Sequence, residues 1–325
     1  MEKKDILEGI HMLVSNNVIG DKQLASRYKG FRGELFLENY LTSKYPNYKQ
    51  MEGGIIISKD SNESSLDNSL YLSIIPEEDF DGSYVEVFSF LSKLNFQKMY
   101  LISYTDNWKE LPVMKYANEN ISLNVPDIII HEFDTDTNTF KTTSNNIEEI
   151  TDFFTTIENR KKNSYPILES TKQWLIDNLE PFSTSQLIKI YLNRLFLDGY
   201  LGFGKEKGKP SDIDMIVKTS ENVYRLIEVK EKDLPKFAKK GFGLDVPRLN
   251  DLVRISYETQ LEYYLIVRQI NNQTERELVA WKFIKIDSFF DNVKEDQTVI
   301  GGTGMRSINS KNETLICDYN LFNNL

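Results

Sequence analysis

Residues 210–217 read PSDIDMIV and residues 224–230 read YRLIEVK. Both stretches are rich in the apolar and β-branched residues that favour strands, and each carries charged residues at alternate positions. The residues between them include a short polar loop, Thr219–Asn222. A short polar loop between two strands indicates an antiparallel hairpin.

The charged residues of this expected hairpin fall on one face. Because strand side chains alternate between two faces, Asp212 and Asp214 share a face of the first strand. Glu228 and Lys230 likewise share a face of the second, and Ile227 points the other way. Either pair alone is typical of an exposed strand edge. Both pairs together, on adjoining strands with the same facing, indicate a functional site.

Carboxylates and a lysine in this arrangement suit a divalent cation. Mg²⁺ prefers carboxylate oxygens, and clustered carboxylates repel one another without a cation. A bound metal polarises a phosphoryl oxygen and lowers the pKa of a water, which a neighbouring lysine can orient. We therefore expect Mg²⁺, with Mn²⁺ able to substitute, held by Asp214, Glu228 and Asp212, with Lys230 positioning the attacking water.

This pattern resembles the signature of the PD-(D/E)XK nuclease superfamily, which includes many restriction endonucleases, resolvases and defence nucleases. The family has an acid on one strand, a short spacer, and Glu-x-Lys on the next. Asp214 lies 14 positions before Glu228 and Asp212 lies 16 before it (228 − 214 and 228 − 212). Asp214 is preferred as the main ligand because it sits deeper in its strand. Ser211 interrupts the family's proline–acid order, which keeps Asp212 as a rival.

The resemblance covers about residues 184–290. It implies an α/β fold with a restriction-endonuclease-like mixed sheet flanked by helices, and a magnesium-dependent endodeoxyribonuclease that uses Asp214, Glu228 and Lys230. The products would carry a 5′-phosphate and a 3′-hydroxyl. The helix expected before the hairpin departs from the family pattern because it contains no acid, and Gln186 or Asn193 could take that place.

A chain of 325 residues predicts two domains at roughly 150 residues each. Because residues 141–165 are largely polar, we expect an N-terminal α/β domain over 1–160 and a nuclease-like domain over 165–325. Helices are expected over 5–16, 31–41, 84–94, 169–179, 185–197 and 248–260. Strands are expected over 53–58, 70–75, 99–104, 127–131, 200–204, 213–218, 223–229, 262–268 and 277–286.

The first half repeats the helix–strand–strand order of the second. Its helix carries Glu34 and Glu38, but no Glu-x-Lys follows its strands. This half could be a degenerate copy of the nuclease fold, with a recognition, regulatory or oligomerisation role. Residues 1–160 hold 15 Lys and Arg against 26 Asp and Glu, a charge of −11, whereas the remainder holds 24 against 23, or +1. The acidic half is therefore a poor DNA-binding surface by itself.

Composition narrows the class of protein. A single cysteine excludes a disulfide scaffold and a cysteine zinc site, and two histidines leave oxygen ligands for any metal. The charged start and the short apolar runs predict a cytoplasmic protein without a signal peptide or membrane span. Within the neutral half, residues expected to follow a nucleic-acid backbone are Lys232, Lys236, Lys239, Lys240 and Arg248.

The sequence thus predicts a metal-dependent DNA endonuclease of restriction–modification or antiviral defence. DNA is the expected partner, with a homodimer and a defence-system protein as further partners. Three alternatives stay open. They are an effector nuclease gated by a ligand or partner protein, a nuclease for junctions or transposon ends, and a non-catalytic module with a nuclease-like fold that only holds nucleic acid.

Overall fold

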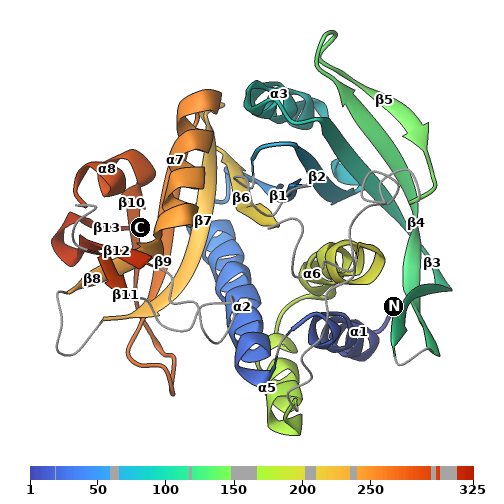
Figure 1. Ribbon diagram of the computed structural model, residues 1–325, viewed down its shortest axis with the longest axis horizontal. Helices are drawn as coiled ribbons and strands as arrows, with labels where there is room; N and C mark the ends of the chain where they lie inside the picture. The colour runs from blue at the N-terminus through green and yellow to red at the C-terminus, as the bar shows by residue number, and fades with distance from the viewer. Residues whose placement is uncertain are drawn as a thin grey trace. The chain divides into compact units, whose positions relative to one another are not determined.

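The computed structural model describes residues 1–18, 20–58, 66–116, 119–147, 167–201, 210–234, 240–293, 298–300 and 313–325. Over these residues the protein is mixed α/β (Figure 1). The α-helices are α1 Lys3–Asn16, α2 Asp21–Lys44, α3 Gly82–Leu91, α5 Glu169–Leu179, α6 Thr184–Arg194, α7 Val246–Thr259 and α8 Ile286–Asp291. None of these described helices combines the length and apolar character that a membrane crossing requires.

Ten of the described strands form one mixed sheet in the order β13-β10-β9-β7-β6-β1-β2-β3-β4-β5, and three form a smaller sheet in the order β11-β12-β8. The strands of the first half are β1 Lys49–Ser58, β2 Ser69–Pro76, β3 Lys98–Tyr116, β4 Glu119–Asp134 and β5 Thr139–Ser144. Those of the second half are β6 Ser211–Lys218, β7 Tyr224–Asp233, β8 Gly241–Asp245, β9 Glu262–Ile270, β10 Leu278–Lys285, β11 Thr298–Ile300, β12 Glu313–Asp318 and β13 Asn323–Asn324.

The chain forms two compact units that do not follow the boundary expected between residues 160 and 165. One unit contains residues 1–28 and 54–212, and the other contains residues 29–53 and 213–325. The chain therefore passes between the units three times. Strand β1 belongs to both, with residues 49–53 in the second unit and residues 54–58 in the first.

In the first unit, β1 and β2 pair antiparallel, and β3 pairs parallel to β2 after the crossover helix α3. Strand β4 then returns antiparallel to β3, and the two form the long hairpin in Figure 1 to which β5 adds. Helices α1 and α6 pack together in this unit. In α6, the Ser183 and Gln186 side chains form a capping box that fixes its start.

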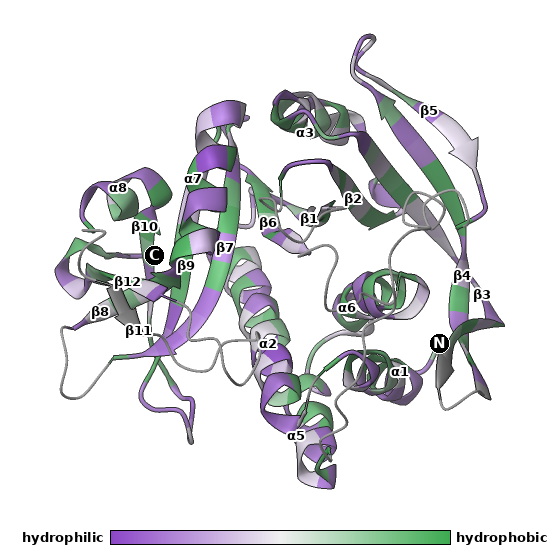
Figure 2. Cartoon of the chain, in the orientation of Figure 1, coloured by the Kyte–Doolittle hydropathy of each residue, from purple (hydrophilic) through white to green (hydrophobic). Residues whose placement is uncertain are grey.

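In the second unit, β6 and β7 pair antiparallel with Met215 opposite Ile227. Strand β9 pairs parallel to β7 after the crossover helix α7, and β10 returns antiparallel to β9. Leu37 and Leu41 of α2 pack on the face of these strands that carries Met215 and Ile227. Along β7 the colour changes from hydrophobic to hydrophilic toward its C-terminal end, where its charged residues begin (Figure 2).

The two halves of the sequence therefore repeat one topology. Each has an antiparallel hairpin, a crossover helix, a parallel strand and an antiparallel strand in the same order. The helix that precedes each hairpin lies mostly in the other unit. Most of α2, which precedes β1, belongs to the second unit, and α6, which precedes β6, belongs to the first.

The strands expected over 99–104 and 127–131 are longer in the structure, and β5, β8, α8, β11, β12 and β13 were not expected. Two further differences have a clear physical reason. Helix α2 begins at Asp21, ten residues before the expected start at 31 (31 − 21), because Leu24 and Tyr28 continue its buried side. The strand expected over 200–204 is wrong at Tyr200, which ends a π-helical turn over Leu195–Tyr200. Arg194 and Arg27 pair with the buried Asp198 in that turn, which favours continued helix. Residues 202–204 lie outside the described residues.

Gly53 offers a test of the close approach of β1 to β6. A Cβ at this position would lie 1.7 Å from the carbonyl oxygen of Ile213, which is backbone and cannot turn aside. We expect Gly53→Ala to lower the free energy of unfolding by about 3 kcal/mol, since overpacking forces the backbone to shift. Urea unfolding measures the loss. Gly82→Ala is the control because a Cβ there meets nothing within 4 Å, and an equal effect of both substitutions would contradict the expectation.

Candidate metal centre

The hairpin predicted from residues 210–230 is present, and its register sets the site. The printed pairs run from Lys218 opposite Tyr224 to Met215 opposite Ile227. Continuing the register by one residue places Asp214 opposite Glu228. Residues directly opposite one another in an antiparallel pair lie on the same face of the sheet. This face is opposite to the one that carries Met215 and Ile227.

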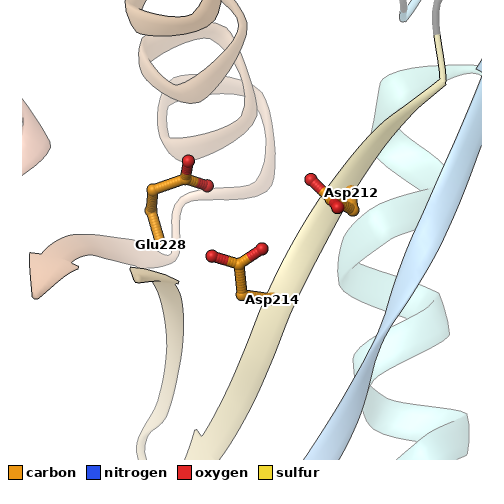
Figure 3. A group of neighbouring side chains, drawn as sticks. All are labelled: Asp212, Asp214 and Glu228. Carbon is orange, nitrogen blue, oxygen red and sulfur yellow. The ribbon is translucent and has the colours of Figure 1, made fainter. Parts of the chain in front are cut away.

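Three carboxylates meet on this face (Figure 3). One carboxylate oxygen from each of Asp212, Asp214 and Glu228 lies within 4.8 Å of the other two. Their burial is graded, because Asp212 is exposed, Asp214 is half-buried and Glu228 is fully buried. Asp212 lies at the end of the first unit and the other two in the second, but Asp212 and Asp214 are on the same strand, β6.

The strand backbone and a lysine hold two of these acids in place. The backbone N–H of Val229 donates to Oδ2 of Asp214 at 2.6 Å. Nζ of Lys230 lies 2.5 Å from Oε1 of Glu228. The Lys230 side chain is 37% exposed and that of Glu228 is 0% exposed. The lysine thus places its ammonium beside a buried carboxylate.

Arg248 is the partner of Glu228 that the sequence reasoning missed. It lies in the first turn of α7, and its Nε donates to Oε1 of Glu228 at 3.2 Å while its Nη2 contacts Oε2. Its side chain is 17% exposed. Arg248 was expected to contact a nucleic-acid backbone, and the structure gives its guanidinium a different partner. The feature of the sequence that could have indicated this pair is an arginine 20 positions after the glutamate, at the start of the expected helix.

The charges around Glu228 and Lys230 keep both side chains ionised. Burial raises the pKa of Glu228, but the nearby Arg248 and Lys230 outweigh burial and hold that pKa at about 2. Partial burial lowers the pKa of Lys230, yet Glu228 and Asp214 raise it by more, so its pKa is raised overall. At neutral pH the site therefore holds a carboxylate beside two cations. Oxygen donors of this kind fit Mg²⁺ or Mn²⁺ chemically.

The remaining predicted site residues are scattered. Lys232 is half-buried near Lys230, and burial followed by the charge of Lys230 lowers its pKa. Lys240 is exposed at the start of the segment that leads into β8. Lys236 and Lys239 lie outside the described residues. Gln186, considered as a substitute for a missing acid, is 7% exposed and its Oε1 accepts from the backbone N–H of Ser183.

No protein-family profile matches the chain, and no curated protein matches it. Among solved structures, the chain is distantly similar to Hjc of Archaeoglobus fulgidus, a Holliday junction resolvase from an archaeal hyperthermophile. The identity is 18%, and the match covers 34% of this chain and 68% of that chain with a TM-score of 0.20.

Proposed function

We propose that the protein is a metal-dependent nuclease whose active site is the acidic cluster on β6 and β7. The observation that carries the proposal is the convergence of three carboxylates within 4.8 Å of one another, with the Lys230 ammonium 2.5 Å from one of them. Asp214, Glu228 and Asp212 would hold the cation. Bound there, a divalent cation supplies the positive charge that polarises a phosphoryl oxygen and acidifies a water.

The protein's own residues then have separate tasks. Val229 N–H donates to one oxygen of Asp214 and so fixes the orientation of this carboxylate. Glu228 provides a desolvated negative charge, which interacts more strongly with a cation than an exposed charge does. Lys230, protonated and partly exposed, can donate hydrogen bonds to an attacking water or to the charge that develops on the phosphate. Its raised pKa makes it a donor rather than a base.

DNA is the proposed substrate, since the duplex backbone presents phosphodiesters to cations such as Lys232 and Lys240. Cutting both strands requires two active sites or two cutting events, which favours a homodimer. Restriction or antiviral defence, with an accompanying partner protein, is the proposed setting. These finer statements follow from the resemblance to PD-(D/E)XK nucleases.

The proposal is tested by incubating the purified full chain with plasmid DNA, phage DNA and single-stranded RNA. Each substrate is tested with Mg²⁺, with Mn²⁺ and with EDTA. Discrete metal-dependent DNA fragments would support a sequence-specific endonuclease, and smearing would support a nonspecific one. Cleavage in EDTA would contradict the metal requirement. Absence of cleavage on every substrate, together with absence of Mn²⁺ binding, would overturn the proposal.

Gating of the nuclease is a second candidate, favoured by Arg248. Arg248 and Lys230 contact both oxygens of Glu228, so they compete with a cation for this carboxylate. A ligand or partner that draws Arg248 away would therefore raise metal affinity, and the phosphate of bound DNA is one such anion.

Arg248→Gln tests this competition. We expect the variant to bind Mn²⁺ about tenfold more tightly in the absence of DNA, because about 1.4 kcal/mol is a factor of ten and a buried ion pair exceeds that. Calorimetric titration measures the affinity. Arg254→Gln is the matched control, since Arg254 lies on the same helix and pairs with Glu258. Unchanged or weaker Mn²⁺ binding in Arg248→Gln would show that the arginine does not compete with the metal.

A further inference from the structure

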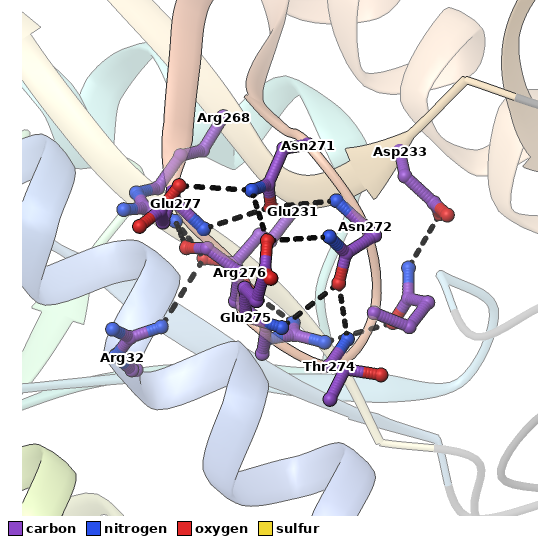
Figure 4. Close-up of polar contacts among 11 residues, drawn as sticks. Arg32, Glu231, Asp233, Arg268, Asn271, Asn272, Thr274, Glu275, Arg276 and Glu277 are labelled. Carbon is purple, nitrogen blue, oxygen red and sulfur yellow. Dashed lines mark hydrogen bonds and ion pairs between the residues drawn. The ribbon is translucent and has the colours of Figure 1, made fainter.

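A second group of buried charges lies on the other face of β7. Glu231 is three residues beyond Glu228, so it shares the face of Ile227 and Val229, on which α2 packs. Figure 4 shows its surroundings, with Arg32 of α2, Arg268 of β9 and Arg276 of the turn after β9. We call Glu231, Arg32, Arg268 and Arg276 the arginine cluster.

The three arginines share a single carboxylate. Nη1 of Arg268 lies 2.6 Å from Oε2 of Glu231, Nη1 of Arg32 lies 4.0 Å from the same oxygen, and Nη2 of Arg276 contacts Oε1. The exposed fractions are 3% for Glu231, 6% for Arg268, 5% for Arg276 and 15% for Arg32. All four side chains are thus largely removed from water.

The cluster holds more positive than negative charge. Three guanidinium groups and one carboxylate give a formal charge of +2 (3 − 1). Burial and then the charge of Arg276 lower the pKa of Lys29, a fourth nearby cation one turn before Arg32. Burial also lowers the pKa of Arg32, with Arg268 and Arg276 acting in the same direction against Glu231. Buried charge without a counter-charge is costly, so a bound anion would be stabilised at the cluster.

Two donors in the cluster are unused. Within the described residues, Nε of Arg268 and Nε of Arg276 are buried and have no hydrogen-bond partner. The acids of the same turn, Glu275 and Glu277, are exposed and accept from Asn271. Unpaired buried donors are uncommon and require an explanation.

The backbone of Arg276 is also unusual. Its φ is +57°, in the left-handed region that residues with a side chain rarely adopt. Its neighbours Glu275 and Glu277 are exposed, whereas Arg276 is buried. The turn therefore adopts a strained conformation that sends one arginine inward, and strain of this kind gathers at ligand sites.

We propose that the arginine cluster binds the phosphate group of a ligand, at a site distinct from the acidic cluster and independent of the proposed nuclease activity. A phosphate monoester carries a charge of about −1.5 to −2 at neutral pH, which would balance the excess of +2. Guanidinium groups offer paired N–H donors that match phosphate oxygens. The phosphate can belong to inorganic phosphate, a nucleotide or a nucleic-acid end, and the test separates these sources.

Thermal unfolding of the full chain in EDTA tests the proposal without metal at the acidic cluster. Inorganic phosphate at a hundredfold excess over its dissociation constant should raise the Tm by about 4 °C above potassium chloride of equal ionic strength. A nucleoside 5′-monophosphate is compared with its nucleoside, and a 5′-phosphorylated oligonucleotide with its 5′-hydroxyl form. The form that acts at the lowest concentration identifies the source. The proposal is overturned if no phosphate compound raises the Tm beyond chloride.

Variants locate the response. Arg276→Gln should weaken phosphate binding about tenfold, while Arg254→Gln, an arginine 34% exposed on α7, should respond as the wild type does. If Arg276→Gln does not fold, Arg32→Gln replaces it as the test of phosphate binding. Arg32 is chosen because it is the arginine farthest from Glu231. A wild-type phosphate response in both cluster variants would place the phosphate elsewhere and refute the proposal.

Discussion

Glu228→Gln should reduce metal-dependent cleavage by about a thousandfold or more. The substitution keeps the shape of the side chain but removes the negative charge from the most buried of the three carboxylates. A bound cation contributes several kcal/mol of transition-state stabilisation, and about 4 kcal/mol corresponds to three orders of magnitude in rate. Single-turnover cleavage at saturating DNA measures the effect, and Mn²⁺ titration should show weakened binding in the same variant.

Two further variants make this result specific. Glu221→Gln is the control, because Glu221 is an exposed acid in the loop of the same hairpin and should leave cleavage unchanged. Lys230→Met should lose cleavage while it retains Mn²⁺ binding, since the lysine is assigned to the water or the phosphate. Full cleavage by Glu228→Gln would remove Glu228 from the active site. Unaltered cleavage by Lys230→Met would remove the lysine's assigned role.

Glu231→Ala is expected to have the largest effect on stability, a loss of about 3–5 kcal/mol in the free energy of unfolding. Removing one partner from a buried ion pair leaves uncompensated charge, and here three arginines lose their shared carboxylate. Urea unfolding in chloride buffer with EDTA measures the loss. Phosphate should restore part of it, because a bound anion supplies the missing negative charge.

The matched comparison is Glu262→Ala. Glu262 also faces two cations, Arg225 and Lys285, but its side chain is 38% exposed. Exposed ion pairs contribute about 1 kcal/mol or less, so this variant should be close to the wild type. A similar loss in both variants would mean that burial does not set the cost at Glu231.

The hairpin was predictable because its determinants are local. The alternation of charged and apolar residues over 210–230 fixes which side chains share a face, and a short loop fixes the pairing. The acids that converge in Figure 3 follow directly from that register. The central helices and strands of each half were predicted for the same reason, whereas β5, β8, α8, β11, β12 and β13 were not.

The contacts between distant segments were not predictable from pattern. Arg248 reaches Glu228 only because α7 lies over that face of β7, and sequence reasoning therefore assigned it to nucleic acid. The arginine cluster joins positions 32, 231, 268 and 276, which lie on a helix, two strands and a turn. The sequence does not distinguish a buried arginine from one exposed to solvent.

The division of the chain into compact units was likewise not predictable from the sequence. A polar stretch near residue 160 indicated a boundary between two consecutive domains, whereas the compact units exchange the helices α2 and α6. Either helix has an apolar side that must be buried, but its sequence does not say against which sheet. The sequence by itself determined the two strands of the hairpin and the candidate metal ligands, because alternation and loop length act locally. Only the tertiary structure decided which helix covers which strands and which charges are paired, because those depend on segments brought together by folding.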